Sequence, residues 1–453
     1  MTEAASSPAR ARVSAAAWLG LFAVLVLLLL GFGLPHWMDW WVAPRAPRNS
    51  SPHEAPPLHG LWRPNLFGPG TVPSIALALL GWRYAAGLAE RLPWRHLLSA
   101  SYATSLAWLL SLALVDGTTG ISRVLGNPTE YLRSARAVGS VHHLIETYAD
   151  RIPYGAPDSW PTSPAGHPPG MLLFFVVLDR LGLGGDLAAG LVVTCVGATT
   201  AVAVLVTLRA LDAEDWARRA APFVVLTPAA VFMAVSADAV IGAVVAWGLA
   251  CLAVAAHRSL WWSVPAGLLL GYAVLMSYGM PLTGLVALGV LVAARSWRPL
   301  PVAAGSALAV VLAFAVSGFA WWEAYPVLRE RYWDGIAQDR PQSYWWWGDL
   351  AAFSLAAGPL VLPGLLAGCA TAASAASRTS ARVVLLLSGT TALAVALADA
   401  SGMSKAEVER IWLPFVPWLT LSVVLLPPGW RRWGLGLQLL TALVVQHAFY
   451  TSW

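Results

Sequence analysis

Two stretches decide the fold of this chain: residues 186–207 read DLAAGLVVTCVGATTAVAVLVT, and residues 239–256 read AVIGAVVAWGLACLAVAA. Asp186 is the only charged residue in either stretch, and each is close to the ~20 residues that a helix needs to cross the hydrocarbon core of a bilayer. Similar runs recur along the chain, which is 58% hydrophobic and has a mean hydropathy of +0.64. The sequence therefore predicts an all-α, polytopic membrane protein.

Hydropathy predicts about 12 to 14 membrane crossings. The segment 14–33 follows Arg10 and Arg12, and no small-residue cleavage site comes after it, so we expect a retained helix rather than a removed signal peptide. Residues 1–95 are interpreted as an N-terminal two-helix extension, and residues 96–453 as the main transmembrane domain. The candidate segments are 14–33, 73–90, 96–115, 170–182, 186–207, 219–235, 239–256, 262–276, 280–295, 299–321, 350–370, 383–399, 411–427 and 433–449.

The net charge of +5 does not indicate a nucleic-acid partner, because the arginines gather at the ends of apolar runs, where they set topology and contact lipid head groups. With Arg91 on the cytoplasmic side, the next helix delivers Asp116 to the outer face. One place conflicts with this rule: if 170–182 and 186–207 form a hairpin of two crossings, Arg209, Arg218 and Arg219 lie outside. Either the run after the Pro168-Pro169 pair does not fully cross the membrane, or this loop breaks the rule. We expect a multi-pass protein of the cytoplasmic membrane whose active site faces outward.

A long outward loop, residues 116–169, concentrates titratable side chains in a chain that is only 11% charged. Loops of this length are usually functional or disordered, and the rigid Pro168-Pro169 pair at its end argues against disorder. Asp116 ends an apolar helix, where the helix dipole disfavours a carboxylate, so it is a candidate general base or ligand of a divalent cation. The other titratable residues considered are Glu130, His142, His143, Asp158 and His167.

Glu130 and His167 are predicted to complete the catalytic set. Glu130 precedes a helical stretch, where an acidic first turn is also favourable for structure alone. His167 precedes a proline and is therefore held in an extended backbone conformation, which gives its ring a defined position.

Further candidates come from later parts of the chain. Arginine binds phosphate bidentately and stays charged, so Arg340 and Arg410 are predicted to bind a donor phosphate, with Tyr344 beside them; contact with lipid head groups is the alternative. Arg340 and Tyr344 belong to a second outward loop, 322–349. An ionisable residue at membrane depth is costly and marks a functional or paired role. On this basis the residues expected to line the cavity are Asp238, Tyr278 and Glu409.

Several common signatures do not occur. The sequence contains no phosphate-binding G-x-x-x-x-G-K-[ST], no H-E-x-x-H and no G-x-S-x-G in a strand context, so nucleotide-driven transport and metalloprotease chemistry have no support. The three cysteines lie in apolar segments without metal-ligand spacing, which indicates packing rather than a disulfide framework.

The order of features resembles the membrane-embedded GT-C glycosyltransferases, particularly the relatives of protein O-mannosyltransferases and lipid A aminoarabinose transferases. The resemblance covers roughly residues 96–250: a helix ending in Asp116, a loop with Glu130-Tyr131, then His167-Pro168-Pro169-Gly170 and Ser236-Ala237-Asp238. It implies a polyprenyl-phosphate sugar donor, inversion at the sugar, Asp116 as catalytic base and Glu130 as second acid. Two extra helices precede the similar region, which makes Asp39 a rival for the catalytic acid.

We therefore expect a membrane glycosyltransferase that moves a hexosyl or pentosyl group to a hydroxyl of a glycan, lipid or protein acceptor. Glu130 and His167 would orient the acceptor or hold a divalent cation, Mg²⁺ or Mn²⁺, if one is used. The main alternative is a transporter or flippase of a lipid-linked or small polar substrate, which would explain a buried Asp238 but usually shows inverted repeats. A non-catalytic membrane assembly partner is the second alternative.

Overall fold

The computed structural model describes residues 7–44, 58, 60–375 and 379–450, and this part of the chain is almost entirely helical. Its two strands, β1 (Leu61–Trp62) and β2 (Phe449–Tyr450), form one short antiparallel ladder that joins the first half of the chain to its C-terminal end. The all-α prediction is therefore confirmed.

Six helices of the described chain are long and apolar enough to cross a membrane, and two bent helix pairs raise the number to eight if each pair is one span. The bent pairs are α15 (Leu300–Val316) with α16 (Trp321–Trp333), at 73°, and α17 (Gln342–Ala357) with α18 (Val361–Ala375), at 98°. The six helices are α1 (Ser7–Trp37), α2 (Thr71–Arg91), α3 (Trp94–Ala113) with its extension η2 (Leu114–Asp116), α9 (Asp186–Ala210), α12 (Ala237–His257) and α19 (Thr379–Ala400).

The multi-pass prediction is confirmed, but six to eight spans are fewer than the crossings expected from hydropathy. Several apolar segments form helices of 12 residues, which reach only ~18 Å against a hydrocarbon core of ~30 Å. These shorter helices are α8 (Pro169–Arg180), α10 (Glu214–Val225), α13 (Ser263–Val274) and α14 (Thr283–Ala294), and α22 (Pro428–Ala448) is longer but more polar.

The remaining elements are single turns that connect the helices. They are α4 (Thr119–Ser122), α5 (Tyr131–Arg136), α6 (Val141–Glu146), η3 (Ala149–Arg151), α7 (Thr162–Ala165), α11 (Ala230–Met233), η4 (Leu260–Trp262), η5 (Met280–Leu282), η6 (Ile336–Asp339), α20 (Val408–Ile411), η7 (Leu413–Phe415), α21 (Val416–Thr420) and η8 (Leu421–Leu425).

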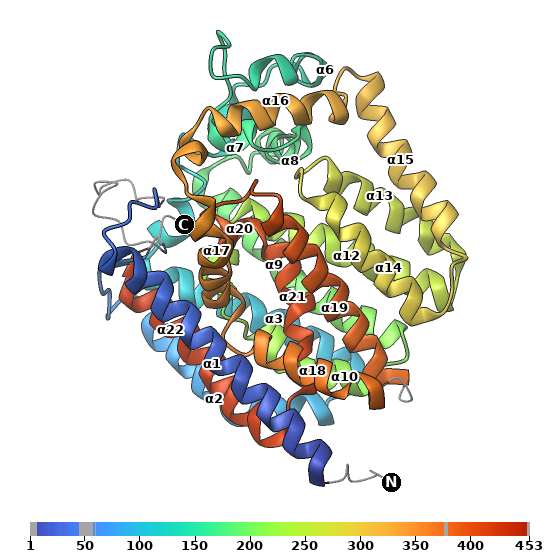
Figure 1. Ribbon diagram of the computed structural model, residues 1–453. Helices are drawn as coiled ribbons and strands as arrows, with labels where there is room; N and C mark the ends of the chain where they lie inside the picture. The colour runs from blue at the N-terminus through green and yellow to red at the C-terminus, as the bar shows by residue number, and fades with distance from the viewer. Residues whose placement is uncertain (1–6, 45–57, 59, 376–378, 451–453) are drawn as a thin grey trace.

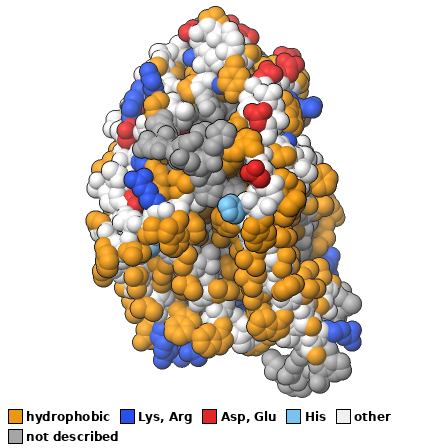
Figure 2. All heavy atoms as spheres, turned by 60° about the vertical axis from the view of Figure 1, so that its left-hand side comes forward, with side chains coloured by type: hydrophobic (Ala, Val, Ile, Leu, Met, Phe, Trp, Pro, Cys, Tyr) orange, Lys and Arg blue, Asp and Glu red, His pale blue; other side chains and the backbone are white. Residues whose placement is uncertain are grey.

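The molecule has two different ends (Figure 1). The short helices α6 and α7 gather with α8 and α16 at one end, which we call the loop end, while the N-terminus lies towards the other. Between the ends, the surface in Figure 2 is a broad hydrophobic band, with charged side chains concentrated above and below it. α1 packs on α17 and α18, and α2 packs on α3, α10 and α22, so both helices belong to the same helical body as the later helices.

The second end is rich in arginine, and we call it the arginine end. It contains the turn between α2 and α3, where Arg218 donates from Nη1 to the carbonyl oxygens of Ala89 and Leu92 at 2.8 and 2.9 Å. The guanidinium of Arg209 lies over the ring of Trp94, 4.5 Å from its centroid. Arg209 and Arg218 thus share one end with Arg91 and Arg95, as the positive-inside rule requires.

The structure bears on the topological conflict after the long loop through the length of α8. α8 has only 12 residues and packs against α5 and α7 in the layer at the loop end, and the backbone N–H of Gly170 donates to the carbonyl of Leu275 at 2.7 Å. α8 is therefore shorter than a membrane-crossing helix, whereas α9 has membrane length, so the two apolar runs are not a pair of membrane-length helices.

The long loop is folded rather than extended. Tyr148 donates to the carbonyl of Pro164 at 2.8 Å, and the guanidinium of Arg331 in α16 donates to the Ile152 carbonyl, to Ser159 Oγ and to the Trp160 carbonyl. One buried arginine thus satisfies three oxygens of the loop and clamps it under α16.

Candidate functional site

A polar pocket of about 420 Å³ opens at the loop end, where the last turn of α22 meets η2 and the short β1–β2 ladder. Side chains from four separate parts of the sequence form its wall. They are Arg63, Pro64, Asn65, Asp116, Arg123, Val231, Val445, Gln446, Phe449 and Tyr450.

Glycines allow the segment before α2 to lie directly against the end of α3. A Cβ atom on Gly68 would lie 1.8 Å from the Val115 carbonyl oxygen, and one on Gly70 would lie 2.0 Å from that of Ser111. Neither position accepts a larger residue without moving the backbone, and this close approach brings residues 63–65 next to η2. The other side of the segment is held by α22, where Asn65 N–H donates to the His447 carbonyl at 2.7 Å.

Asp116 is half-buried in the pocket and is oriented by two neutral amides. Asn65 Nδ2 donates to Asp116 Oδ1 at 2.9 Å and to the Val115 carbonyl at 3.1 Å, while Gln446 Nε2 lies 3.4 Å from Oδ2. Gly117 follows with φ of 67°, a left-handed conformation that suits glycine and turns the chain away. No ion pair to Asp116 occurs among the described residues, so its carboxylate is positioned without being neutralised by a cation.

Two arginines give the same pocket a positive side. The guanidinium carbons of Arg63 and Arg123 lie 5.4 and 4.8 Å from the ring centroid of Tyr450, and both side chains are exposed. Such stacking fixes the orientation of a guanidinium group above the ring and keeps its positive charge at the pocket wall. Sequence reasoning missed both residues, although Arg123 lies only seven positions after Asp116.

Three of the predicted residues meet elsewhere, in a buried charge network. Arg410 Nη1 lies 2.8 Å from Glu130 Oε1, and its Nε lies 2.7 Å from Asp238 Oδ2. The exposed fractions of Glu130, Asp238 and Arg410 are 2%, 3% and 5%. Ser236 caps α12 and donates from Oγ to Asp238 Oδ2 at 3.1 Å. Glu409, next in the chain, is buried as well.

The network keeps its arginine charged. Burial alone lowers the pKa of Arg410, but the carboxylates of Glu130 and Asp238 outweigh it and raise this pKa above its ordinary value. The three side chains come from the long loop, α12 and α20, so the network ties these segments together. One oxygen of Glu130, Oε2, is buried without a hydrogen-bond partner among the described residues.

Arg340 and Tyr344 are anchors within the protein. Arg340 is buried and donates to the carbonyls of Lys405 at 2.5 Å and Ala43 at 3.1 Å, and Tyr344 donates to the carbonyl of Gly31 at 2.8 Å. These bonds attach the second loop to the end of α1 and to the segment before α20. Their polar atoms therefore face protein oxygens, and neither residue lines the polar pocket.

His167 lies at the start of α8, under the long loop. Its Nδ1 is 2.9 Å from the Ser163 carbonyl, and its ring meets the edge of Tyr131, which stacks on Phe175 with centroids 5.3 Å apart. Burial, and then the charges of Asp238 and Glu130, raise the pKa of Tyr131 far above its ordinary value, so its hydroxyl stays protonated. His167 thus borders the buried network rather than the pocket.

The remaining candidates also lie outside the pocket wall. Tyr278 packs against Trp321 in an aromatic cluster, and burial raises the pKa of its hydroxyl. Asp39 is exposed after α1 with φ of 53°, and His142 and Asp158 are exposed on the loop.

The described residues contain no group of three or more His, Cys, Asp or Glu side chains that could hold a metal ion. Among the described residues that line the pocket, Asp116 is the single carboxylate, and its oxygens accept from two amides. This donor set does not fit a divalent cation held by the protein alone, because Mg²⁺ and Mn²⁺ require several oxygen ligands.

No protein-family model matches the chain, and no curated protein matches it. The fold and the pocket define a class: a multi-pass helical membrane protein with a polar pocket that contains two arginines at one end of an apolar bundle.

Proposed function

We propose that this protein is a membrane glycosyltransferase of the GT-C type and that the Asp116 pocket is its active site. The observation that carries the proposal is the convergence of one carboxylate and two exposed guanidinium groups in an open polar pocket beside an apolar bundle. The donor is a polyprenyl-phosphate sugar, and the acceptor is a hydroxyl group of a glycan, lipid or protein. The resemblance of residues 96–250 to GT-C enzymes supports the same chemistry.

In this mechanism Asp116 removes the proton of the acceptor hydroxyl, whose oxygen attacks the anomeric carbon from the side opposite the phosphate. The bond between that carbon and the phosphate oxygen breaks, and the electron pair leaves with polyprenyl phosphate, so the sugar inverts. Arg63 and Arg123 bind the phosphate and stabilise the negative charge that grows on it. Asn65 and Gln446 orient the base, which is the condition for an efficient proton transfer.

These assignments revise the hypothesis from sequence at two points. The donor phosphate goes to Arg63 and Arg123, because Arg340 and Arg410 direct their guanidinium groups to protein oxygens. Glu130 and His167 hold the long loop in place through contacts within the protein, and they do not bind the acceptor. No step is routed through a divalent cation, since the described wall of the pocket contains one carboxylate.

The proposed location is the cytoplasmic membrane, with the pocket facing outward. It rests on the positive-inside rule, which places the arginine end in the cytoplasm and therefore the loop end outside. An exoplasmic pocket suits a lipid-linked donor, which reaches the site through the membrane.

The test is release of polyprenyl phosphate from a labelled polyprenyl-phosphate sugar by the purified full chain in lipid vesicles. A transferase releases it in the presence of acceptor and loses this activity on Asp116→Asn substitution. A transporter or flippase moves the labelled lipid across the vesicle without release, and a scaffold does neither. Either of the last two results would rule out the proposal.

A further inference from the structure

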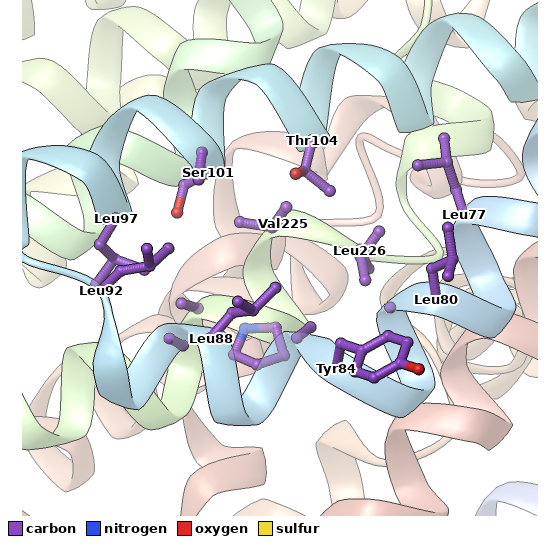
Figure 3. A pocket seen from close by; sticks show the side chains of 16 residues that line it. Leu77, Leu80, Tyr84, Leu88, Leu92, Leu97, Ser101, Thr104, Val225 and Leu226 are labelled. Carbon is purple, nitrogen blue, oxygen red and sulfur yellow. The ribbon is translucent and has the colours of Figure 1, made fainter.

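A second pocket, of about 390 Å³, is almost purely apolar and lies between α2, α3 and α10. Figure 3 shows side chains of α2 and α3 facing one another across it, with Leu92 and Leu97 at one end and Leu77 and Leu80 at the other. Because α2 and α3 are membrane-length helices, this groove lies at the depth of the hydrocarbon core. Its chemistry suits a hydrocarbon chain and excludes a polar ligand.

The end of the groove at the α2–α3 turn is basic. Arg91 and Arg95 flank this turn, are exposed, and have no side-chain partner among the described residues. Arg218 donates to the carbonyls of Ala89 and Leu92, which both line the groove, and is itself paired with Glu214. The turn at the Leu92 and Leu97 end of the groove therefore carries two exposed arginines.

The surroundings of the turn have an excess of positive charge. The pKa of Arg431 is lowered, first by burial and then by the charge of Arg219, with Glu90 opposing the shift. Arg432 adds a further guanidinium over the ring of Trp82, 5.7 Å from its centroid. An anion at this end would reduce the repulsion between these arginines that the carboxylates of Glu90 and Glu214 leave in place.

We propose that this groove is a binding site for an anionic phospholipid, with one acyl chain between α2, α3 and α10 and the phosphate at Arg91 and Arg95. From Leu77 to Leu92 the helix rises about 22 Å, enough for a chain that crosses one leaflet of a ~30 Å core. Arginines at the membrane surface favour anionic over zwitterionic head groups. The positive charge of Arg91 and Arg95 at this end of the groove is the reason to assign an anionic lipid rather than a neutral one.

This site is separate from the proposed active site. Asp116 lies 12 residues beyond Thr104, the last residue of α3 that lines the groove, which corresponds to about 18 Å along the helix. A donor whose phosphate is bound by Arg63 and Arg123 has its head group at the loop end, whereas the phosphate proposed here lies at the arginine end. The lipid site therefore does not depend on transferase activity.

The experiment measures binding of phosphatidylglycerol and of phosphatidylcholine with matched acyl chains to the delipidated, purified full chain by native mass spectrometry. We expect the wild type to prefer phosphatidylglycerol roughly 30-fold, as two arginines near an anionic head group imply. The double substitution Arg91→Gln with Arg95→Gln abolishes the preference, whereas Arg298→Gln, an exposed arginine between α14 and α15, leaves it unchanged. Ala85→Phe, which fills the groove, weakens binding of both lipids, and Ala86→Phe, on the exposed side of α2, does not.

Equal binding of the two lipids by the wild type would overturn the proposal, as would a preference that survives the double substitution. A third measurement uses polyprenyl phosphate in place of phosphatidylglycerol. If polyprenyl phosphate binds more tightly than phosphatidylglycerol, the groove belongs to the sugar donor and our assignment is wrong. Asp116→Asn should keep the preference for phosphatidylglycerol whether or not the chain is a transferase. If Ala85→Phe does not fold, the two surface arginine substitutions still decide the question.

Discussion

The two charged sites near the loop end contain the same kinds of side chain and differ in how these are used. In the buried network, Arg410 is enclosed between Glu130 and Asp238, and all three have less than a tenth of their surface exposed. In the pocket, Asp116 accepts from the side-chain amides of Asn65 and Gln446, while the nearby arginines stack on Tyr450 and are exposed.

This difference suggests a structural role for the buried network and a chemical role for the pocket. A charge pair closed to solvent has its interactions already made, so it fixes the segments that contribute to it and has little capacity for a ligand. A carboxylate held by neutral donors keeps its charge available to a substrate. We therefore expect substitutions in the network to change stability and substitutions in the pocket to change turnover.

The largest effect is predicted for Asp116→Asn. Removal of a general base costs about 10²- to 10⁴-fold in kcat, while the amide keeps the shape and one acceptor oxygen. The measurement is release of polyprenyl phosphate per enzyme, with the unfolding temperature recorded in parallel. Asp39→Asn is the matched control, because Asp39 is the rival acid; loss of turnover in this variant and not in Asp116→Asn would move the active site away from the pocket.

The next effect is predicted for Arg410→Met. It leaves Glu130 and Asp238 buried without their cation, which costs about 3–5 kcal/mol of folding free energy. Denaturant or thermal unfolding in detergent measures it. The triple variant Glu130→Gln, Asp238→Asn, Arg410→Met removes all three charges and should recover most of the loss. A triple variant as unstable as the single one would show that the charge network is not the cause.

A smaller effect is predicted for Arg63→Gln and for Arg123→Gln. A hydrogen bond to a charged phosphate is worth at least about 1.5 kcal/mol, so each change should raise KM for the donor about tenfold and leave the unfolding temperature unaltered. Arg133→Gln is the control, since this exposed arginine belongs to the same loop and lies outside the pocket wall. A KM that stays constant in both pocket variants would remove the arginines from donor binding.

The smallest effect is predicted for His142→Gln and Asp158→Asn. Both residues are exposed, and the contact of His142 with Glu146 is a 4.0 Å surface pair. Surface changes of this kind alter stability by less than about 0.5 kcal/mol. Turnover and unfolding should match the wild type. A large loss of turnover in either variant would mean that the exposed part of the loop takes part in catalysis.

Part of the site could be predicted from sequence. Asp116 was found because an acid at the C-terminal end of an apolar helix is unfavourable for the helix dipole, and the structure places it in a polar pocket. The pairing of Asp238 was also anticipated by the cost of an ionisable group at membrane depth, although its partners, Glu130 and Arg410, were assigned other roles. Nothing in the sequence marks Arg63 and Arg123 as site residues, because the sequence around an arginine next to an apolar run is the same whether the side chain faces lipid or a pocket.

The number of crossings was overestimated for a related reason. Hydropathy reports that a segment is apolar, but it does not report where turns divide it. Residues 170–182 are apolar, but α8 has only 12 residues and packs against α5 and α7. Short helices buried by neighbouring protein and helices surrounded by lipid have the same composition.

By itself, the sequence determined that this chain is an all-α, multi-pass membrane protein with a polar loop at 116–169, because hydrophobicity and helix length are local properties. The tertiary structure alone decided which charges meet. Asp116 is joined by Asn65, Arg123 and Gln446, and Arg410 by Glu130 and Asp238, through contacts between residues up to 330 positions apart. Hydrophobic burial places the helices together, and only then do their few polar side chains separate into a closed network and an open pocket.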